Sequence, residues 1–114
     1  MRRLCVLALG VACLAVAAPA ALGGGAHASR AAKIGDNFYR PRALTVAKGG
    51  TVTWRWDGRR RHDVFFTSGP RSGRPRPCRA QRHGNCARKF RKAGRYGYVC
   101  TIHGSMTGKV VVRR

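Results

Sequence analysis

The sequence contains no glutamate, and its only acidic residues are the aspartates Asp36, Asp57 and Asp63. Against these three carboxylates stand 24 lysines and arginines, so the formal net charge at pH 7 is +21 with histidine neutral. The excess says nothing about the fold, but it favours association with polyanions, acidic proteins or anionic membrane surfaces. The length of 114 residues leaves room for one domain and excludes a large multi-domain enzyme.

The chain also lacks an internal repeat of about 20 to 50 residues, which excludes solenoids and propellers. No segment has helical periodicity, whereas apolar and polar residues alternate over 51–56, 62–66 and 96–100. Further strands are expected at 43–46, 87–92 and 108–112, with turn residues between them. Six or seven short strands predict an all-β fold, an antiparallel sandwich or barrel.

The first 28 residues differ in composition from the rest. Two arginines precede an apolar run over 4–22, and the segment ends in a small-x-small triplet. This pattern predicts an export signal cleaved after Ala28. The alternative is a retained membrane anchor, because about nineteen apolar residues just span a bilayer. We expect an exported protein, periplasmic, extracellular or at the cell envelope, whose mature part is a single domain of residues 29–114.

A second change of composition occurs at residues 68–85, which are rich in glycine, proline, arginine and serine. The dipeptide Gly69-Pro70 and the run Arg74-Pro75-Arg76-Pro77 are incompatible with a central strand. We expect a long basic loop here. Removal of Arg2 and Arg3 with the signal would leave 22 basic and three acidic residues, a charge of about +19.

Three cysteines remain in the predicted mature chain: Cys78, Cys86 and Cys100. An odd number in an exported protein suggests one disulfide and one thiol with another role. Cys100 is followed at spacings of three by His103 and Met106, and glycines at 104 and 108 allow that segment to curl. A thiolate, an imidazole and a thioether can therefore converge on one point.

A second imidazole is available from His62, which begins another predicted strand. Two imidazoles and a thiolate with a weak axial thioether form the donor set of a blue-copper electron-transfer site. Zinc is the chemical alternative, but structural zinc prefers four firm nitrogen or sulfur ligands with closely spaced cysteines, and Cys78 and Cys86 are eight residues apart. The pattern therefore favours copper.

The sequence resembles the cupredoxins, in particular the small plastocyanin-, pseudoazurin- and amicyanin-like proteins. The resemblance extends from Lys33 to Val112. It is carried by Asp36-Asn37-Phe38-Tyr39-Arg40-Pro41 with Leu44-Thr45-Val46, by Gly50-Thr51-Val52-Thr53-Trp54, by His62-Asp63-Val64, and by the stretch from Gly94 to His103 with Met106, Gly108 and Val110. Order, spacing and turn positions agree throughout.

This resemblance implies a Greek-key β-sandwich that holds one copper ion and transfers single electrons between redox partners. It implies the ligands His62, Cys100, His103 and Met106. No substrate is transformed in such a protein, so we expect no enzyme activity. Where many members of the family have asparagine beside the upstream histidine, this chain has Asp63, whose ionised carboxylate accepts hydrogen bonds but donates none.

Two other functions remain open from the sequence. The chain could carry copper in the cell envelope with incidental redox activity, or act as a basic surface-adhesion module with a structural metal. The same four ligands serve copper carriage and electron transfer, so the sequence alone does not separate them. Cys78 and Cys86 are best interpreted as a disulfide that closes a small loop and leaves Cys100 free.

The basic residues point to a negatively charged partner. Arg59-Arg60-Arg61 directly precede His62, and other cations crowd the 68–85 loop and the residues after it. We expect them to steer a monomeric protein toward acidic redox partners or an anionic membrane surface. Export and the lack of a motif that interleaves aromatic with basic residues argue against nucleic acid as the partner.

The donor set predicts a visible signature. The mature protein should bind one Cu(II) and turn intensely blue or green through thiolate-to-copper charge transfer, and Cys100→Ala should abolish the colour. The visible absorption spectrum after addition of Cu(II) checks this. A colourless copper adduct, or strong colour in the Cys100→Ala variant, would contradict the assignment.

Overall fold

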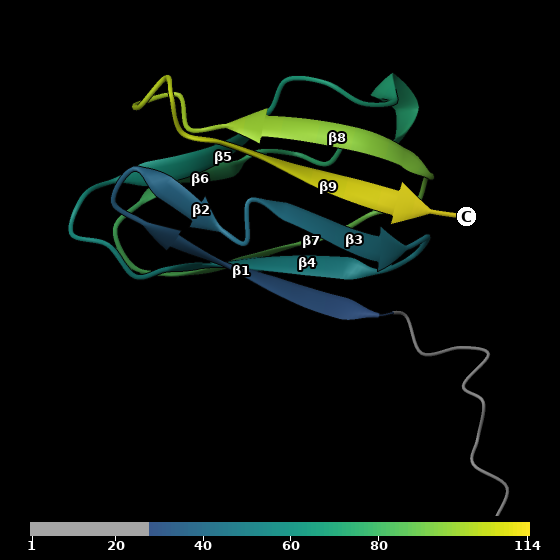
Figure 1. Cartoon of the computed structure of the whole chain (residues 1–114), viewed down its shortest axis with the longest axis horizontal. Coiled ribbons are helices and arrows are strands. Elements are labelled where there is room, and N and C mark those ends of the chain that lie inside the picture. Colours follow the sequence, from purple (N-terminus) through teal and green to yellow (C-terminus); the bar gives the residue numbers. More distant parts are fainter. Residues whose placement is uncertain (1–27) are drawn as a thin grey trace, which may run out of the picture.

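Two β-sheets packed face to face form the molecule (Figure 1). The computed structural model describes residues 28–114, so the predicted signal segment lies outside the described residues except for its last position. The four-stranded sheet has the order β2-β1-β4-β7, and the five-stranded sheet has the order β3-β9-β8-β5-β6. The strands are β1 Ser29–Gly35, β2 Phe38–Arg40, β3 Ala43–Ala47, β4 Thr51–Trp56, β5 His62–Phe66, β6 Cys78–Gln81, β7 Gly84–Lys89, β8 Gly94–Val99 and β9 Thr107–Arg113.

The predicted β-sandwich is confirmed, and strands β4 and β5 have the predicted bounds, whereas β8 begins two residues earlier and ends one residue earlier than expected. In β4 the side chains of Val52, Trp54 and Trp56 are buried, while the intervening residues are partly or fully exposed. Residues of β8 alternate in the same way, with Tyr96 and Tyr98 in the core. Period-two alternation identifies such strands because successive side chains point to opposite faces of a sheet.

The expectation of six or seven antiparallel strands was wrong in two respects. The described residues form nine strands, and two pairs are parallel, β1 with β4 and β3 with β9. Strand β1 was missed because its apolar positions are mostly alanine, and β2 because it spans three residues. Both strands are held by sheet pairing more than by their own residue pattern.

The prediction that residues 68–85 form one loop was also wrong. They contain a 3₁₀ turn at Arg71–Gly73, strand β6 and the first residues of β7. Strand β6 tolerates its position after the prolines because it lies at the edge of its sheet, paired only with β5 among the described strands. Strand β7 begins at residue 84 and ends at 89, whereas a strand over 87–92 was expected. Phe90, just beyond its end, is fully buried.

Aromatic side chains fill the space between the sheets. Tyr98 packs edge-on against Tyr39 and Trp54, with ring centroids 4.8 and 5.4 Å apart. Phe66 and Phe90 extend the cluster, and their ring centroids lie 5.9 Å apart. Edge-to-face packing of large rings gives a small domain a rigid interior. Within residues 28–114 no helix is long and apolar enough to cross a membrane.

Candidate metal centre

Three donor atoms meet at one end of the sandwich. The Nδ1 atoms of His62 and His103 lie 3.2 Å apart. The Sγ atom of Cys100 lies 3.9 Å from Nδ1 of His62 and 3.6 Å from Nδ1 of His103. These residues come from the start of β5 and from the segment that links β8 to β9, about forty positions apart in the chain. The sequence prediction that they converge is confirmed.

The spacing of these atoms fits a single metal ion. First-row ions such as zinc bind imidazole nitrogen at about 2.0 Å and thiolate sulfur at about 2.3 Å, so two nitrogens on one ion are at most about 4.1 Å apart and a nitrogen and a sulfur about 4.3 Å. All three observed separations are shorter than these limits. One ion can therefore contact all three atoms without movement of the backbone. A soft thiolate with two imidazoles is the donor chemistry that suits copper.

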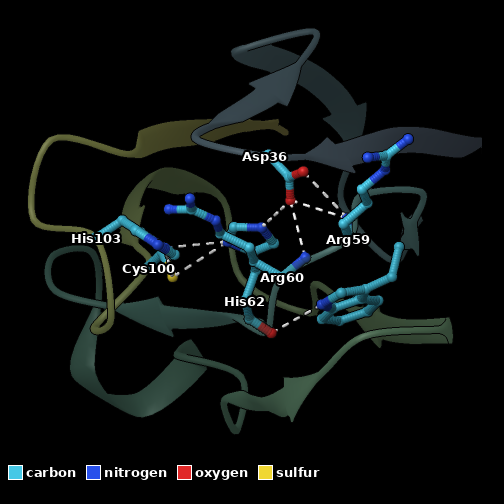
Figure 2. A network of polar contacts seen from close by, with 7 residues as sticks. Asp36, Arg59, Arg60, His62, Cys100 and His103 are labelled. Carbon is cyan, nitrogen blue, oxygen red and sulfur yellow. Dashed lines mark hydrogen bonds and ion pairs between the residues drawn. The ribbon is translucent and has the colours of Figure 1, made fainter.

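His62 is fixed on its other side by a carboxylate. Its Nε2 atom lies 3.1 Å from Oδ1 of Asp36. A dashed line marks this contact in Figure 2. A carboxylate only accepts hydrogen bonds, so the proton of a neutral His62 sits on Nε2 and the Nδ1 lone pair faces the other donors. Side chains that bond the second nitrogen of a ligating histidine fix its tautomer and ring orientation in this way. The sequence analysis did not assign this role to Asp36.

The position of Asp36 is set by the chain before His62. Its carboxylate accepts hydrogen bonds from the backbone N–H groups of Arg59 and Arg60, each at 3.0 Å from Oδ1. The hydrogen bond from His62 and those from the two backbone amides lower the pKa of Asp36 to about 2. The carboxylate is therefore charged at any physiological pH. The basic run before His62 contributes to the site through its backbone.

Trp56 holds the backbone of His62. The indole Nε1 donates a hydrogen bond of 2.8 Å to the carbonyl oxygen of His62. Trp56 packs on the buried face of β4, and its hydrogen bond also fixes the entry into β5. Alternation along β4 could reveal the burial of Trp56 but not its hydrogen-bond partner.

The segment from Cys100 to Met106 closes on itself. The backbone N–H of His103 donates to the carbonyl of Cys100, and the N–H of Met106 donates to the carbonyl of His103 at 2.9 Å. The N–H of Cys100 in turn donates to the carbonyl of Met106 at 2.9 Å. Met106 is buried, with 1% of its surface exposed, at the start of the return into β9. The predicted curl of this loop is confirmed.

Asp63 ties the two ligand-bearing segments together. Its Oδ1 accepts a hydrogen bond of 2.7 Å from the backbone N–H of Thr101, and its Oδ2 accepts one from the Thr101 hydroxyl. The hydroxyl of Tyr39 donates to the carbonyl of Asp63 at 2.6 Å, and burial raises the pKa of Tyr39, so that hydroxyl stays protonated. An aspartate serves at this position because both of its partners on Thr101 are donors.

The cysteine pairing follows the predicted pattern. Cys78 and Cys86 form a disulfide, and Cys100 is a free, buried thiol. The disulfide joins β6 of one sheet to β7 of the other. The thiol that the sequence left unpaired is the one that lies within 3.9 Å of both histidine Nδ1 atoms.

A known protein family matches almost all of the described chain. The model of the family of copper-binding proteins of the plastocyanin/azurin type matches residues 26–113. The chain is similar to amicyanin-alpha of Methylorubrum extorquens, with 33% identity over 115 residues that cover 93% of this chain and 97% of that protein.

Several solved protein structures are also similar to this chain. An amicyanin variant in its oxidised state superposes with a TM-score of 0.62 at 31% identity, covering 73% of this chain and 80% of that one. A purple cupredoxin from Nitrosopumilus maritimus matches in fold, with a TM-score of 0.60, 24% identity, and coverage of 73% and 98%. A copper-containing nitrite reductase from Thermus scotoductus matches with a TM-score of 0.65 and 25% identity over 76% of this chain, which spans 23% of that protein.

The contact between Asp36 and His62 generates a prediction. Asp36→Ala should weaken copper binding by about 10- to 100-fold, because the buried His62 ring loses the partner that fixes its tautomer. Asp36→Asn keeps a side-chain oxygen and should restore most of the affinity. Competition titration against a copper chelator measures both.

Asp57→Ala is the matched control, because Asp57 makes an exposed ion pair with Lys33 and no hydrogen bond or ion pair with a donor residue within residues 28–114. It removes the same charge and should leave copper affinity unchanged. Equal losses in Asp36→Ala and Asp57→Ala would show that net charge, and not the orientation of His62, controls binding.

Proposed function

The chain belongs to the plastocyanin/azurin family of copper-binding proteins, and on that premise we propose that it is a single-electron carrier. We assign His62, Cys100 and His103 as the firm copper ligands and Met106 as the weak axial one. The observation that supports this most strongly is the approach of two Nδ1 atoms and one Sγ atom to within 3.9 Å of one another. Copper in such a site supplies a one-electron Cu(II)/Cu(I) couple.

The protein contributes a site that need not rearrange when the charge changes. His62 is held at Nε2 by Asp36 and at its carbonyl by Trp56. The loop that carries the other ligands is closed by its own backbone hydrogen bonds and by Asp63. A donor set fixed from several sides resists the different geometries that Cu(I) and Cu(II) prefer, and this resistance keeps electron exchange fast.

Met106 suits the axial role because of its chemistry and its burial. The thioether is a soft, weak donor that stabilises Cu(II) only slightly. Its backbone is hydrogen-bonded to both His103 and Cys100, so the side chain starts beside the donor cluster.

Electrons are exchanged at the His103 edge. His62 and Cys100 are fully buried, whereas His103 is partly exposed. Ile102, beside it, is 51% exposed and offers an apolar contact that excludes water from a docked partner. The basic run at 59–61 lies at the same end of the sandwich, since it leads directly into His62, and it suits partners with acidic surfaces.

We propose that this chain is an electron carrier and not an enzyme. The match to the nitrite reductase spans under a quarter of that protein, and the match to amicyanin-alpha spans nearly all of that one. An electron carrier is complete in one small domain. The similarity over the full length therefore favours a carrier over an enzyme.

Export of the protein is part of the proposal. The pattern of residues 1–28 supports cleavage of a signal, and the disulfide between Cys78 and Cys86 suits an oxidising compartment. Both features agree with function in the periplasm or the cell envelope.

Electrochemistry and copper transfer together test electron carriage against copper carriage. The copper-loaded protein should show a reversible one-electron wave and should retain Cu(I) against a moderate chelator, because two of its firm ligands are fully buried. Met106→Leu should keep copper bound and raise the potential, since loss of the thioether disfavours Cu(II) further. His103→Ala should open the exposed ligand position to added imidazole.

If the parent protein readily gives up Cu(I) to the chelator and its voltammetric wave is slow or irreversible, the results would favour a copper carrier. Equal loss of copper from Met106→Leu and His103→Ala would show that the axial and equatorial roles are misassigned.

A further inference from the structure

A hollow lined by cations lies at the other end of the sandwich from the donor cluster. It has a volume of about 380 Å³ and runs between the segment after the 3₁₀ turn and the end of β7, with Arg74, Arg76, Arg88, Lys89 and Arg91 along its walls. A second hollow of about 570 Å³ shares Arg76 and Arg88 with it and adds Arg79. We call the two together the basic groove. No acidic side chain lines either part.

The walls of the basic groove are fixed by hydrogen bonds. Arg88 donates from Nε to the carbonyl of Arg76 and from Nη2 to the carbonyl of Pro77, each at 2.8 Å. Lys92 donates to the hydroxyl of Ser72 at 2.8 Å. Two cations thus fasten the proline-rich segment to the sandwich. The groove has a defined shape, unlike a flexible basic tail.

Four cations of the groove remain available. The side chains of Arg76, Arg79, Lys89 and Arg91 are exposed and make no hydrogen bond or ion pair within residues 28–114. The carboxylates of that part of the chain are engaged elsewhere: Asp36 at His62, Asp57 at Lys33, and Asp63 at Thr101. Gathering like charges in a concave surface without counter-ions raises the local potential and concentrates anions there.

We propose that the basic groove binds a linear phosphate polymer of the inorganic polyphosphate kind. A chain of phosphates carries one charge per unit without bulky side groups, and so it can follow a narrow groove while each free cation contacts a different phosphate. Arginine is suited to this because its planar fork can form paired hydrogen bonds to phosphate oxygens.

The chemistry of the groove argues against two other polyanions. Proteins that bind single-stranded nucleic acid combine cations with aromatic side chains on which bases stack, and no aromatic residue lines the groove. A membrane surface would be met by a face with apolar anchors. Among the described residues the exposed large hydrophobics are Phe38, Phe65 and Ile102, and none of them lines the groove.

The register of the sheet separates this groove from the copper end. On β4, Trp56 lies opposite Gly84 near the donor cluster, whereas Thr51 lies opposite Lys89 at the groove, a rise of about 17 Å along the strand. In Figure 1 the 3₁₀ turn and the loop after β8 accordingly lie at opposite ends of the sandwich. A polymer in the groove leaves the His103 edge free for a redox partner, so the proposal does not depend on the assigned function.

This placement refines the expected role of the arginines. The sequence suggested one basic surface that steers redox partners. In the structure the run at 59–61 accompanies the donor cluster, while Arg74 and Arg76 lie at the far end. We assign steering to the first set and anchoring to the second.

Calorimetric titration of the copper-loaded protein with medium-chain polyphosphate tests the proposal. The probe variant is Arg76→Gln/Lys89→Gln/Arg91→Gln. The control, Arg30→Gln/Lys109→Gln/Arg113→Gln, removes the same charge from exposed positions outside the groove. Loss of three phosphate contacts should reduce the slope of log K against log salt by about 2, so that between about 50 and 200 mM salt the parent loses about 16-fold more affinity than the probe variant. The control should keep the parent's slope.

An unchanged copper spectrum in both variants establishes that they are folded. Equal reductions of affinity in the probe and control variants would overturn the proposal, because they would show that the diffuse charge of the whole surface binds polyphosphate. Failure of the parent to bind polyphosphate would also overturn it. Tighter binding of single-stranded DNA per phosphate would overturn it in favour of nucleic acid. Binding to phosphatidylglycerol vesicles that polyphosphate does not displace would overturn it in favour of a membrane surface.

Discussion

The fixed orientation of the buried His62 ring is the constraint on which the rest of the site depends. An imidazole with no exposed surface needs a partner for each polar atom, and the two nitrogens of His62 have different ones. Asp36 accepts from Nε2, which leaves Nδ1 to face Cys100 and His103. Without that carboxylate the ring could adopt the other tautomer, and its lone pair would face away from the thiolate.

The sandwich brings this arrangement together from distant segments. Asp36 lies in the turn between β1 and β2, and the parallel pairing of β1 with β4 places that turn beside the residues that follow Trp56. Those residues donate backbone hydrogen bonds to Asp36 and then continue into His62. Asp63, the next residue, fastens the loop that carries Thr101 and the remaining proposed ligands. The donor atoms are held by sheet topology and by two carboxylates.

The sequence predicted the parts of the site that depend on local spacing. Cys100, His103 and Met106 lie within one short loop, so their residue types and spacing were enough, and alternation placed His62 on a buried face. Asp36 and Trp56 were not assigned because their roles arise from pairing between strands far apart in sequence. Strand β6 escaped prediction for a similar reason, since its pairing with β5 and its disulfide outweigh the flanking prolines.

We propose that the fold holds the assigned copper ligands in place before copper binds. Crystal structures of the copper-free, Cu(I) and Cu(II) forms test it most directly. We expect the distance between the two Nδ1 atoms, 3.2 Å here, to differ by less than about 0.5 Å between the three forms. The distances from Sγ of Cys100 to the two nitrogens, 3.6 and 3.9 Å here, should differ by less than the same amount. Rotation of either histidine ring away from the thiolate in the copper-free protein, or a loss of the Asp36 contact to His62 on loading, would contradict it.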